Sequence, residues 1–401
     1  MKSNIPKKLA KREFLKYGLA GLGGMACSMS PLKLFAGPFR EADNVIDGIG
    51  YANDIRNIKP SDELWKWSKE CMYYTETPRG LRCKVCPNDC DIKPNEVGDC
   101  KTRLSKNGKL YTLVYGNPCA IHVDPIEKKP LYHFLPASRA FSIATAGCNL
   151  VCLNCQNWEI SQKSPKETKN FDLMPSAVVE QCISRKCESI AYTYSEPLTF
   201  YEYTHDTAKL AKAKGIKNVL VSAGYIYEEP LRKLCKYIDA ANIDLKSFKD
   251  SIYEKLNGVK LEPILKTLKI MKEENVWLEI TNLIIPSWTD DLVMIKEMCD
   301  WLYKNGLHEC PLHFSRFRPL YKLTQLPSTP VSTLDKARKI ALDAGIKYVY
   351  IGNVPGNLAE NTYCYKCKKI VIERKGYRII SNNIENNSCK FCKEKIAGVW
   401  K

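Results

Sequence analysis

The stretch FSIATAGCNLVCLNCQNWEISQ, residues 141–162, joins a short apolar run to three closely spaced cysteines. The apolar residues FSIAT predict a buried β-strand. Cys148, Cys152 and Cys155 follow it, separated by three and then two residues, with no fourth cysteine nearby. A structural zinc site or a closed iron–sulfur cluster takes four protein ligands, so three predict a metal centre with one open coordination position.

Strands and helices are predicted to alternate from Phe141 onward. Helical segments such as PILKTLKIMKEEN and DLVMIKEMCDWLYKNG separate a series of β-rich apolar runs, namely FSIAT, SIAYTY, NVLVS, NIDL, LEITNLII, LHFSR and YVYIG. This alternation predicts an α/β domain with a parallel sheet, either doubly wound or curved toward a (β/α) barrel.

Chemically reactive side chains follow or lie within these runs. Glu196 comes after SIAYTY, Ser222 closes NVLVS, Asp244 and Lys246 stand at the end of NIDL, and His313 lies in LHFSR. In parallel α/β folds the reactive groups collect at the carboxyl ends of the strands, so we expect them near the three cysteines. For His313, a structural histidine and a substrate-facing acid or base both fit the pattern.

Eight further cysteines fall into two sets of four. Tight spacing in a chain of 401 residues favours metal ligation in a reducing compartment over disulfides. The C-terminal set forms two Cys-x2-Cys knuckles, a pattern typical of a zinc ribbon, and the N-terminal set fits either structural zinc or a second iron–sulfur cluster. The sets are Cys83, Cys86, Cys90 and Cys100, and Cys364, Cys367, Cys389 and Cys392.

The composition is that of an ordinary globular protein with a net charge of +17. It argues against disorder and against several membrane spans. A positive net charge favours binding to nucleic acid, to an anionic surface or to an acidic partner. The lysines of this chain are dispersed along the sequence rather than clustered. We therefore expect no nucleic-acid site from charge alone.

The N-terminus leaves two interpretations of the compartment open. Its basic start, Gly-rich apolar stretch and Lys11-Arg12 pair resemble a twin-arginine export signal, and a disordered start of a cytoplasmic protein fits as well. The apolar part is too short for a transmembrane span. The predicted organisation is residues 1–40 as this segment, 41–135 as a lead-in and Cys-rich metal-binding segment, 136–355 as the main domain and 356–401 as a four-cysteine module.

The spacing Cys148-x3-Cys152-x2-Cys155 is that of radical S-adenosylmethionine (radical SAM) enzymes. The phrases HVDPIEKKPLYHFLP, ATAGCN, CQNWEISQ, YTYSEP and IDLKSF resemble the AmmeMemoRadiSam system subgroup, which is similar to the pyruvate formate-lyase activating enzymes. The resemblance implies a partial (β/α)6 barrel. It also implies a 4Fe–4S cluster on the three cysteines and an S-adenosylmethionine on the fourth iron, cleaved reductively to a 5′-deoxyadenosyl radical that abstracts hydrogen from an unidentified substrate.

The resemblance also implies roles for single residues. Glu196 would accept hydrogen bonds from the ammonium group of S-adenosylmethionine, Lys246 would pair with its carboxylate, and Asp244 would contact the ammonium or the ribose. Ser222 would line the sugar, and the backbone of residues 351–353 would border the adenine.

One position departs from the family pattern. Asn154 stands before the last cysteine, where many members have an aromatic residue near the adenine. Trp158 is the alternative aromatic, unless it is an ordinary loop residue.

The resemblance also implies partners. A flavodoxin or ferredoxin would deliver the electron, and the substrate would be a glycyl-radical protein or a small molecule processed with a Memo-like partner. Cluster assembly would take place in the cytoplasm. The hypothesis from another class is a zinc-ribbon nucleic-acid-binding protein without radical chemistry.

Overall fold

The computed structural model describes residues 64–401. The predicted segment 1–40, with its export-signal interpretation, lies outside the described residues. The described residues belong to one compact unit. Among the helices of residues 64–401, none is both long and apolar enough to cross a membrane.

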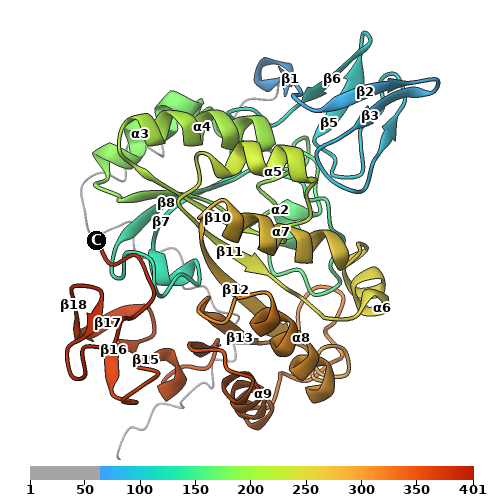
Figure 1. Cartoon of the computed structure of the whole chain (residues 1–401). Coiled ribbons are helices and arrows are strands. Elements are labelled where there is room, and N and C mark those ends of the chain that lie inside the picture. The colour runs from blue at the N-terminus through green and yellow to red at the C-terminus, as the bar shows by residue number, and fades with distance from the viewer. Residues whose placement is uncertain (1–63) are drawn as a thin grey trace, which may run out of the picture. The chain divides into compact units, whose positions relative to one another are not determined.

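An eight-stranded sheet forms the centre of the described chain (Figure 1). Strands β8 to β14 are parallel and lie in chain order, and β7 pairs antiparallel with β8. A doubly wound sheet reverses its strand order, so the uninterrupted order identifies a curved (β/α) arrangement instead. The strands are β7 (Ala120–Pro125), β8 (Arg139–Ala144), β9 (Ser189–Tyr192), β10 (Lys217–Ser222), β11 (Ala240–Asp244), β12 (Trp277–Ile284), β13 (Leu312–Arg316) and β14 (Val349–Gly352).

The predicted α/β class with a parallel sheet is confirmed. Each of the seven apolar runs overlaps one of the seven parallel strands that residues 64–401 form, one more than a six-stranded partial barrel would have. Strand β7 was not predicted, because the prolines in and after it argue against a strand.

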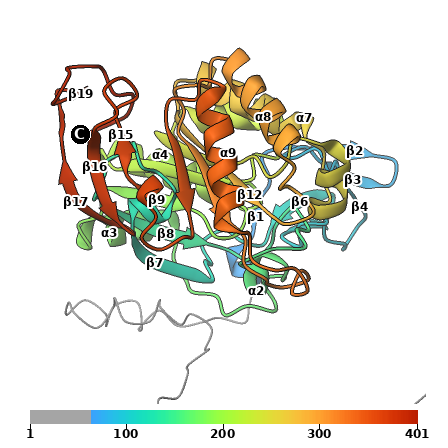
Figure 2. The ribbon, with the colours of Figure 1, turned by 90° about the horizontal axis from the view of Figure 1, so that it is seen from below.

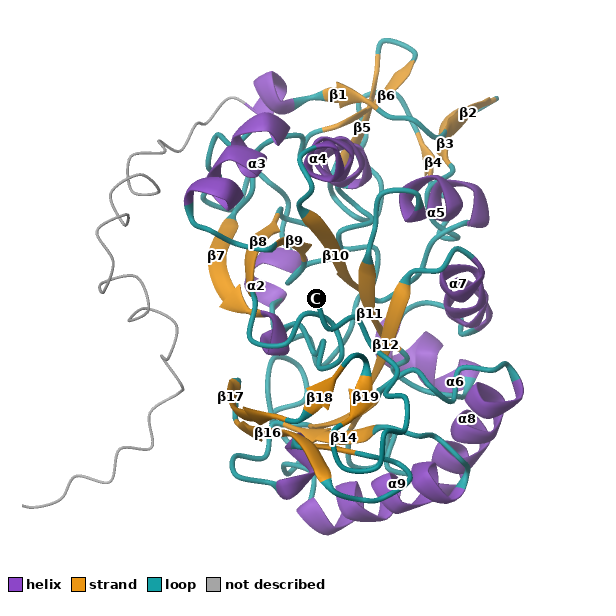
Figure 3. Ribbon diagram, turned by 60° about the vertical axis from the view of Figure 1, so that its left-hand side comes forward, coloured by secondary structure: helices purple, strands orange, loops and turns teal. Residues whose placement is uncertain are grey.

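Helices cover the outer side of the sheet (Figure 3). Each connects two neighbouring parallel strands, and its apolar side packs on the sheet in one large core. The long helices are α3 (Pro175–Ser184), α4 (Tyr201–Ala213), α5 (Glu228–Cys235), α7 (Glu262–Glu273), α8 (Leu292–Lys304) and α9 (Val331–Asp343). The short helical segments are α2 (Trp158–Ser161), α6 (Asp250–Ile252) and the π-helical turn η3 (Tyr253–Asn257).

The inner side of the sheet is closed near the amino ends of its strands. Small residues on neighbouring strands, among them Ala140, Ala191 and Ala240, leave room there for the segment 126–135, which begins with the 3-10 helix η2 (Ile126–Lys128). Ile126, Leu131 and Phe134 of this segment are buried against those alanines. The segment therefore forms the floor of the barrel.

The N-terminal segment forms two small antiparallel sheets and the 3-10 helix η1 (Leu64–Trp67). Short strands run through residues 81–103, although this stretch is rich in cysteines and turn residues. Arg103 anchors the segment to the main domain through a buried ion pair of 2.9 Å with Glu202 on α4. The strands are β1 (Lys69–Glu70), β2 (Tyr74–Thr77), β3 (Gly80–Cys83), β4 (Asp91–Ile92), β5 (Arg103–Lys106) and β6 (Lys109–Thr112).

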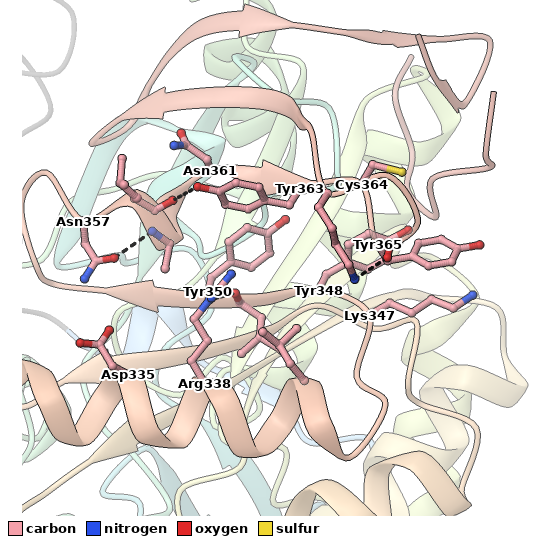
Figure 4. Close-up of a pocket in the computed structure, with 15 residues that line it drawn as sticks. Asp335, Arg338, Lys347, Tyr348, Tyr350, Asn357, Asn361, Tyr363, Cys364 and Tyr365 are labelled. Carbon is pink, nitrogen blue, oxygen red and sulfur yellow. Dashed lines mark hydrogen bonds between the residues drawn. The ribbon is translucent and has the colours of Figure 1, made fainter. Parts of the chain in front are cut away.

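The C-terminal module lies on the opposite side of the domain from β2, β3 and β4 (Figure 2). Its buried Arg374 donates to the carbonyl oxygen of Tyr132 in the barrel floor at 2.8 Å. A surface pocket between this module, α9 and β14 is lined by Arg338, Tyr350 and Cys364 among others (Figure 4). The elements are η4 (Leu358–Glu360), β15 (Thr362–Tyr363), β16 (Ile370–Lys375), β17 (Arg378–Asn382), β18 (Ile384–Glu385) and β19 (Ser388–Cys389).

Candidate metal and cofactor site

The three-cysteine loop follows β8 and is held by the turn η3, which lies after β11. The amides of Val151 and Leu153 donate to the carbonyl oxygens of Asn257 and Leu256 at 3.0 and 2.9 Å. Gly258 ends this turn with φ +75°, and a Cβ there would lie 2.4 Å from Val151 Cγ2. A glycine is therefore required for the close approach of the two segments.

Polar groups of the chain contact each of the three sulfurs. Asn257 Nδ2 donates to Cys152 Sγ at 3.1 Å, and the Leu150 amide donates to Cys148 Sγ at 3.4 Å. Cys155 Sγ lies 3.0 Å from Ser161 Oγ. Burial raises the pKa of Cys148 and of Cys152, and Lys246 opposes the rise at Cys152. A metal must therefore displace thiol protons when it binds.

Glu196 is buried at the carboxyl ends of β9 and β10. Its Oε1 accepts from Ser222 Oγ at 2.7 Å, and its Oε2 accepts from the amide of Ala223 at 2.8 Å. Burial raises the pKa of Glu196, while these hydrogen bonds oppose the rise. Ser222 thus fixes the orientation of a carboxyl group that lies in the electrostatic field of Cys148.

Lys246 and Asp244 form an ion pair at the carboxyl end of β11. Lys246 Nζ lies 2.6 Å from Asp244 Oδ2, and the side chains are 20% and 36% exposed. Burial by itself would lower the pKa of Lys246, but Asp244 and Cys152 raise it above its ordinary value. Lys246 therefore stays cationic beside the cysteine loop.

Three asparagine oxygens in and around this loop have no hydrogen-bond partner. Asn149, Asn154 and Asn257 each keep a buried Oδ1 without a donor. Such an acceptor costs about 1 to 3 kcal/mol, so its presence in a native site calls for an explanation. S-adenosylmethionine carries ammonium, hydroxyl and amino donors, and the thiols, the cation and these acceptors fit a cluster with that ligand.

His313 lies near the amino end of β13, not at the carboxyl edge. Its Nε2 is 2.7 Å from Glu279 Oε2, and its ring stacks on Tyr350. The structure thus places it in the barrel floor as a satisfied structural histidine. The expectation that His313 lies near the three cysteines was wrong, because a residue early in a parallel strand lies at the closed end of the barrel.

Two other predicted adenine neighbours have partners within the chain. Trp158 stacks on Tyr321, with ring centroids 5.3 Å apart and planes at 12°. Asn353, after β14, donates from Nδ2 to the carbonyl oxygen of Arg316 at 3.2 Å. Asn154 is half-buried, with its Oδ1 buried, so this position offers an amide rather than an aromatic ring.

The two four-cysteine sets differ in geometry. In the C-terminal set, Cys364 and Cys392 have sulfurs 3.6 Å apart, and Cys367 and Cys389 have sulfurs 3.7 Å apart. Among the described residues, this is the group of metal-ligating side chains whose ligand atoms all lie within 4.8 Å. The N-terminal cysteines instead line a cavity.

Sequence reasoning missed Asn257 and Tyr253. Asn257 contacts Cys152, and the Tyr253 hydroxyl accepts from the Lys246 amide at 2.8 Å. The pair Asn257-Gly258 is a turn signal that pointed to a tight connection. The signal gave no indication that this turn meets a loop more than a hundred positions earlier in the chain.

Comparison with known proteins decides the family. The Radical SAM superfamily matches residues 142–302, the span that contains the cysteine loop, Glu196, Ser222 and Lys246. The chain is also 45% identical over 331 residues to an uncharacterized protein of Methanocaldococcus jannaschii, covering 82% of this chain and 98% of that protein. The chain belongs to the radical SAM superfamily. It is thus a radical SAM enzyme, and its family uses a 4Fe–4S cluster and S-adenosylmethionine.

Other relatives are activating enzymes. The chain is 27% identical to the pyruvate formate-lyase 1-activating enzyme of Escherichia coli K12 over 151 residues, 36% of this chain and 61% of that enzyme. A solved domain of pyruvate-formate lyase-activating enzyme from Bacteroides vulgatus is 19% identical, with a TM-score of 0.36, covering 41% of this chain and 99% of that one. The family membership favours the enzyme hypothesis over a nucleic-acid-binding protein without radical chemistry.

Proposed function

We propose that the chain holds a 4Fe–4S cluster on Cys148, Cys152 and Cys155 and binds S-adenosylmethionine beside Glu196 and Lys246. When bound, the cluster supplies the electron that cleaves S-adenosylmethionine to methionine and a 5′-deoxyadenosyl radical, which takes a hydrogen atom from the substrate. The observation that carries this proposal is the three-thiol loop at the carboxyl edge of a parallel sheet, next to a buried carboxyl group and a cation.

The residues at this edge have separable tasks. Lys246, kept cationic by Asp244, pairs with the carboxylate of S-adenosylmethionine, and Asp244 is then free to contact the ammonium or the ribose. Glu196 accepts from the ammonium, and Ser222 orients Glu196. The turn η3 fixes the cysteine loop and shields Cys152 from water.

We propose a glycyl-radical protein as the substrate class. The support comes from relatives named as activating enzymes for pyruvate formate-lyase and for 4-hydroxyphenylacetate decarboxylase. A small molecule processed with a Memo-like partner is the alternative. A flavodoxin or ferredoxin is the proposed electron donor, since the chain carries a net charge of +17 and such carriers are acidic.

Anaerobic reconstitution with iron and sulfide tests the chemistry. The protein should turn brown, bleach with dithionite, and form 5′-deoxyadenosine and methionine from S-adenosylmethionine. Deuterium from a labelled candidate substrate should appear in the 5′-deoxyadenosine. A colourless zinc protein that leaves S-adenosylmethionine intact would contradict the proposal.

We also propose that the C-terminal module is a structural zinc site. Zinc–sulfur bonds of about 2.3 Å put tetrahedral thiolates about 3.8 Å apart, close to the 3.6 and 3.7 Å observed. Replacing Cys389 and Cys392 with alanine should release one zinc and lower thermal stability. Soluble variant protein should still form 5′-deoxyadenosine, and loss of that activity with zinc retained would contradict a structural role.

The compartment is a further proposal. We propose that the cluster is assembled in the cytoplasm, with twin-arginine export from a signal within residues 1–40 as the alternative. Fractionation of cells that express the full chain distinguishes the two.

A further inference from the structure

The four cysteines of the N-terminal segment surround one cavity. Cys83, Cys86, Cys90 and Cys100 line one small cavity with a volume of about 20 Å³. Cys83 ends β3, Cys86 and Cys90 lie in the connection to β4, and Cys100 precedes β5. The fold thus brings thiols from separate stretches to one point, at the junction with the main domain.

The spacing of these sulfurs differs from that of a zinc site. A single tetrahedral zinc ion needs thiolates about 3.8 Å apart. The C-terminal set has this spacing, whereas within residues 64–401 no three of the N-terminal sulfurs lie within 4.8 Å of one another. A 4Fe–4S cluster binds each thiolate to a different iron, so its ligands stand apart around a central volume. The N-terminal arrangement fits the cluster.

The lining of the cavity suits an anionic, water-excluding occupant. Arg103 lines it with a buried guanidinium group, which donates to both oxygens of Glu202 at 3.1 and 2.9 Å. Apolar side chains, including those of Val85, Ile92 and Leu198, cover other parts of the wall. A cluster with four thiolates is negatively charged, and Arg103, although paired with Glu202, puts a cationic group in the wall of the cavity.

The cavity adjoins the first metal site through the backbone on both sides of Cys148. Asn149 lines the cavity, and its carbonyl oxygen accepts from Asn88 Nδ2 at 2.9 Å. On the other side, a Cβ on Gly147 would lie 2.4 Å from the carbonyl oxygen of Cys100. The residues on both sides of Cys148 therefore contact the N-terminal segment at Asn88 and Cys100.

We propose that Cys83, Cys86, Cys90 and Cys100 bind a second 4Fe–4S cluster that passes electrons to the cluster at Cys148, Cys152 and Cys155. It takes one electron from an external one-electron donor, hands the same electron on and returns to its oxidised state, with no bond made or broken. Because all four irons have protein ligands, it has no open position for S-adenosylmethionine. The relay role rests on the proposed function, and the metal site does not.

Metal analysis of the anaerobically reconstituted wild-type protein is the first test. Two clusters and the C-terminal zinc give about eight irons and about one zinc per chain. If the N-terminal cysteines hold zinc, the result is instead about four irons and two zincs. The second result overturns the proposal, and it does so without any variant.

Variants then assign the irons. The triple variant C148A/C152A/C155A should keep about four irons and give, after dithionite reduction, an electron paramagnetic resonance signal that S-adenosylmethionine leaves unchanged. The variant C86S/C90S should keep the S-adenosylmethionine-sensitive signal and lose about half of the iron. Should C86S/C90S fail to fold, the triple variant still decides, since a triple variant without iron overturns the proposal.

The relay is tested by the rate of 5′-deoxyadenosine formation with flavodoxin as donor. C86S/C90S should be at least tenfold slower than wild type, and C235A, which removes a buried cysteine on α5, should match wild type. An unchanged rate in C86S/C90S would overturn the relay. Failure of the proposed function looks different, because the wild type would then hold about eight irons and form no 5′-deoxyadenosine.

Discussion

Buried polar side chains at the two ends of the barrel differ in how their hydrogen bonds are satisfied, as Glu279 in the floor and two asparagines at the carboxyl edge show. In the floor, buried Glu279 accepts from the amides of Tyr132 and His133 at 3.0 and 2.7 Å and pairs with His313. At the carboxyl edge, Asn154 and Asn257 keep oxygens without donors. The difference indicates that Glu279 and His313 serve stability, whereas the oxygens of Asn154 and Asn257 are available to a ligand.

The floor network reaches into the C-terminal module. His133 Nδ1 donates to the carbonyl oxygen of Ala397 at 2.6 Å, and its Nε2 accepts from the hydroxyl of Tyr350. Arg374 donates to Thr362 Oγ1 at 2.7 Å and stacks over Tyr132. A module that carries its own metal-ligating cysteines is thereby joined to the barrel by buried polar contacts.

The largest effect is expected from Cys152→Ala at the carboxyl edge of the sheet. With only three thiols, the cluster has no spare ligand, so iron should fall by about four per chain and 5′-deoxyadenosine formation should stop. Iron analysis and product chromatography measure this. Cys299→Ala on α8 is the matched control and should keep both. Full iron content in Cys152→Ala would remove this residue from the metal site.

The next effect concerns the floor. Glu279→Ala leaves His313 and two backbone amides without an acceptor, so the free energy of unfolding should fall by about 3 to 5 kcal/mol. Chemical denaturation of the holoenzyme measures the loss. Glu273→Ala, which removes an exposed ion pair with Arg232, should cost less than about 1 kcal/mol. Equal costs for the two variants would refute the assignment of the floor to stability.

The pH dependence of stability tests the same network. Burial lowers the pKa of His133 to about 4 from its ordinary value of 6.5. The unfolded chain therefore binds more protons between these values, so this contribution is complete above pH 6.5 and is lost as the pH falls toward 4. The loss is on the order of 3 kcal/mol.

Comparison with His133→Gln isolates this residue, since the acid lability of the metal sites is common to both proteins. The variant should be less stable at pH 7 and show a flatter decline between pH 6.5 and 4 in chemical denaturation. Parallel curves for variant and wild type would show that another group causes the acid sensitivity.

The smallest effect is expected from Lys246→Ala, also at the carboxyl edge of the sheet. The cluster should remain, and affinity for S-adenosylmethionine should fall by one charged hydrogen bond, about 1.5 to 3 kcal/mol or about 10- to 150-fold. Equilibrium binding to the reconstituted protein measures this. Lys249→Ala, which removes an exposed pair with Asp291 of 2.9 Å, is the control and should leave affinity unchanged. Similar losses in both variants would argue for a general effect of positive charge.

Much of the fold could be predicted because its signals are local. A strand buried on both faces needs an unbroken apolar run, and all seven parallel strands had one. Spacing likewise grouped the cysteines. The antiparallel β7 was missed because proline-rich surroundings concealed it, and His313 was misplaced because a run of five residues does not say which end of the strand faces a ligand.

The sequence by itself determined the α/β class with a parallel sheet, the three cysteine sets and most of the groups that stand at strand ends. Each depends on residues close together in the chain. Only the tertiary structure decided that Asn257 reaches Cys152, that Ser222 is bonded to Glu196 and that the N-terminal thiols surround a cavity while the C-terminal thiols converge on a point. These features join segments that are far apart in the chain. The distance between two sulfurs depends on how such segments pack, and the spacing of cysteines along the sequence does not specify that packing.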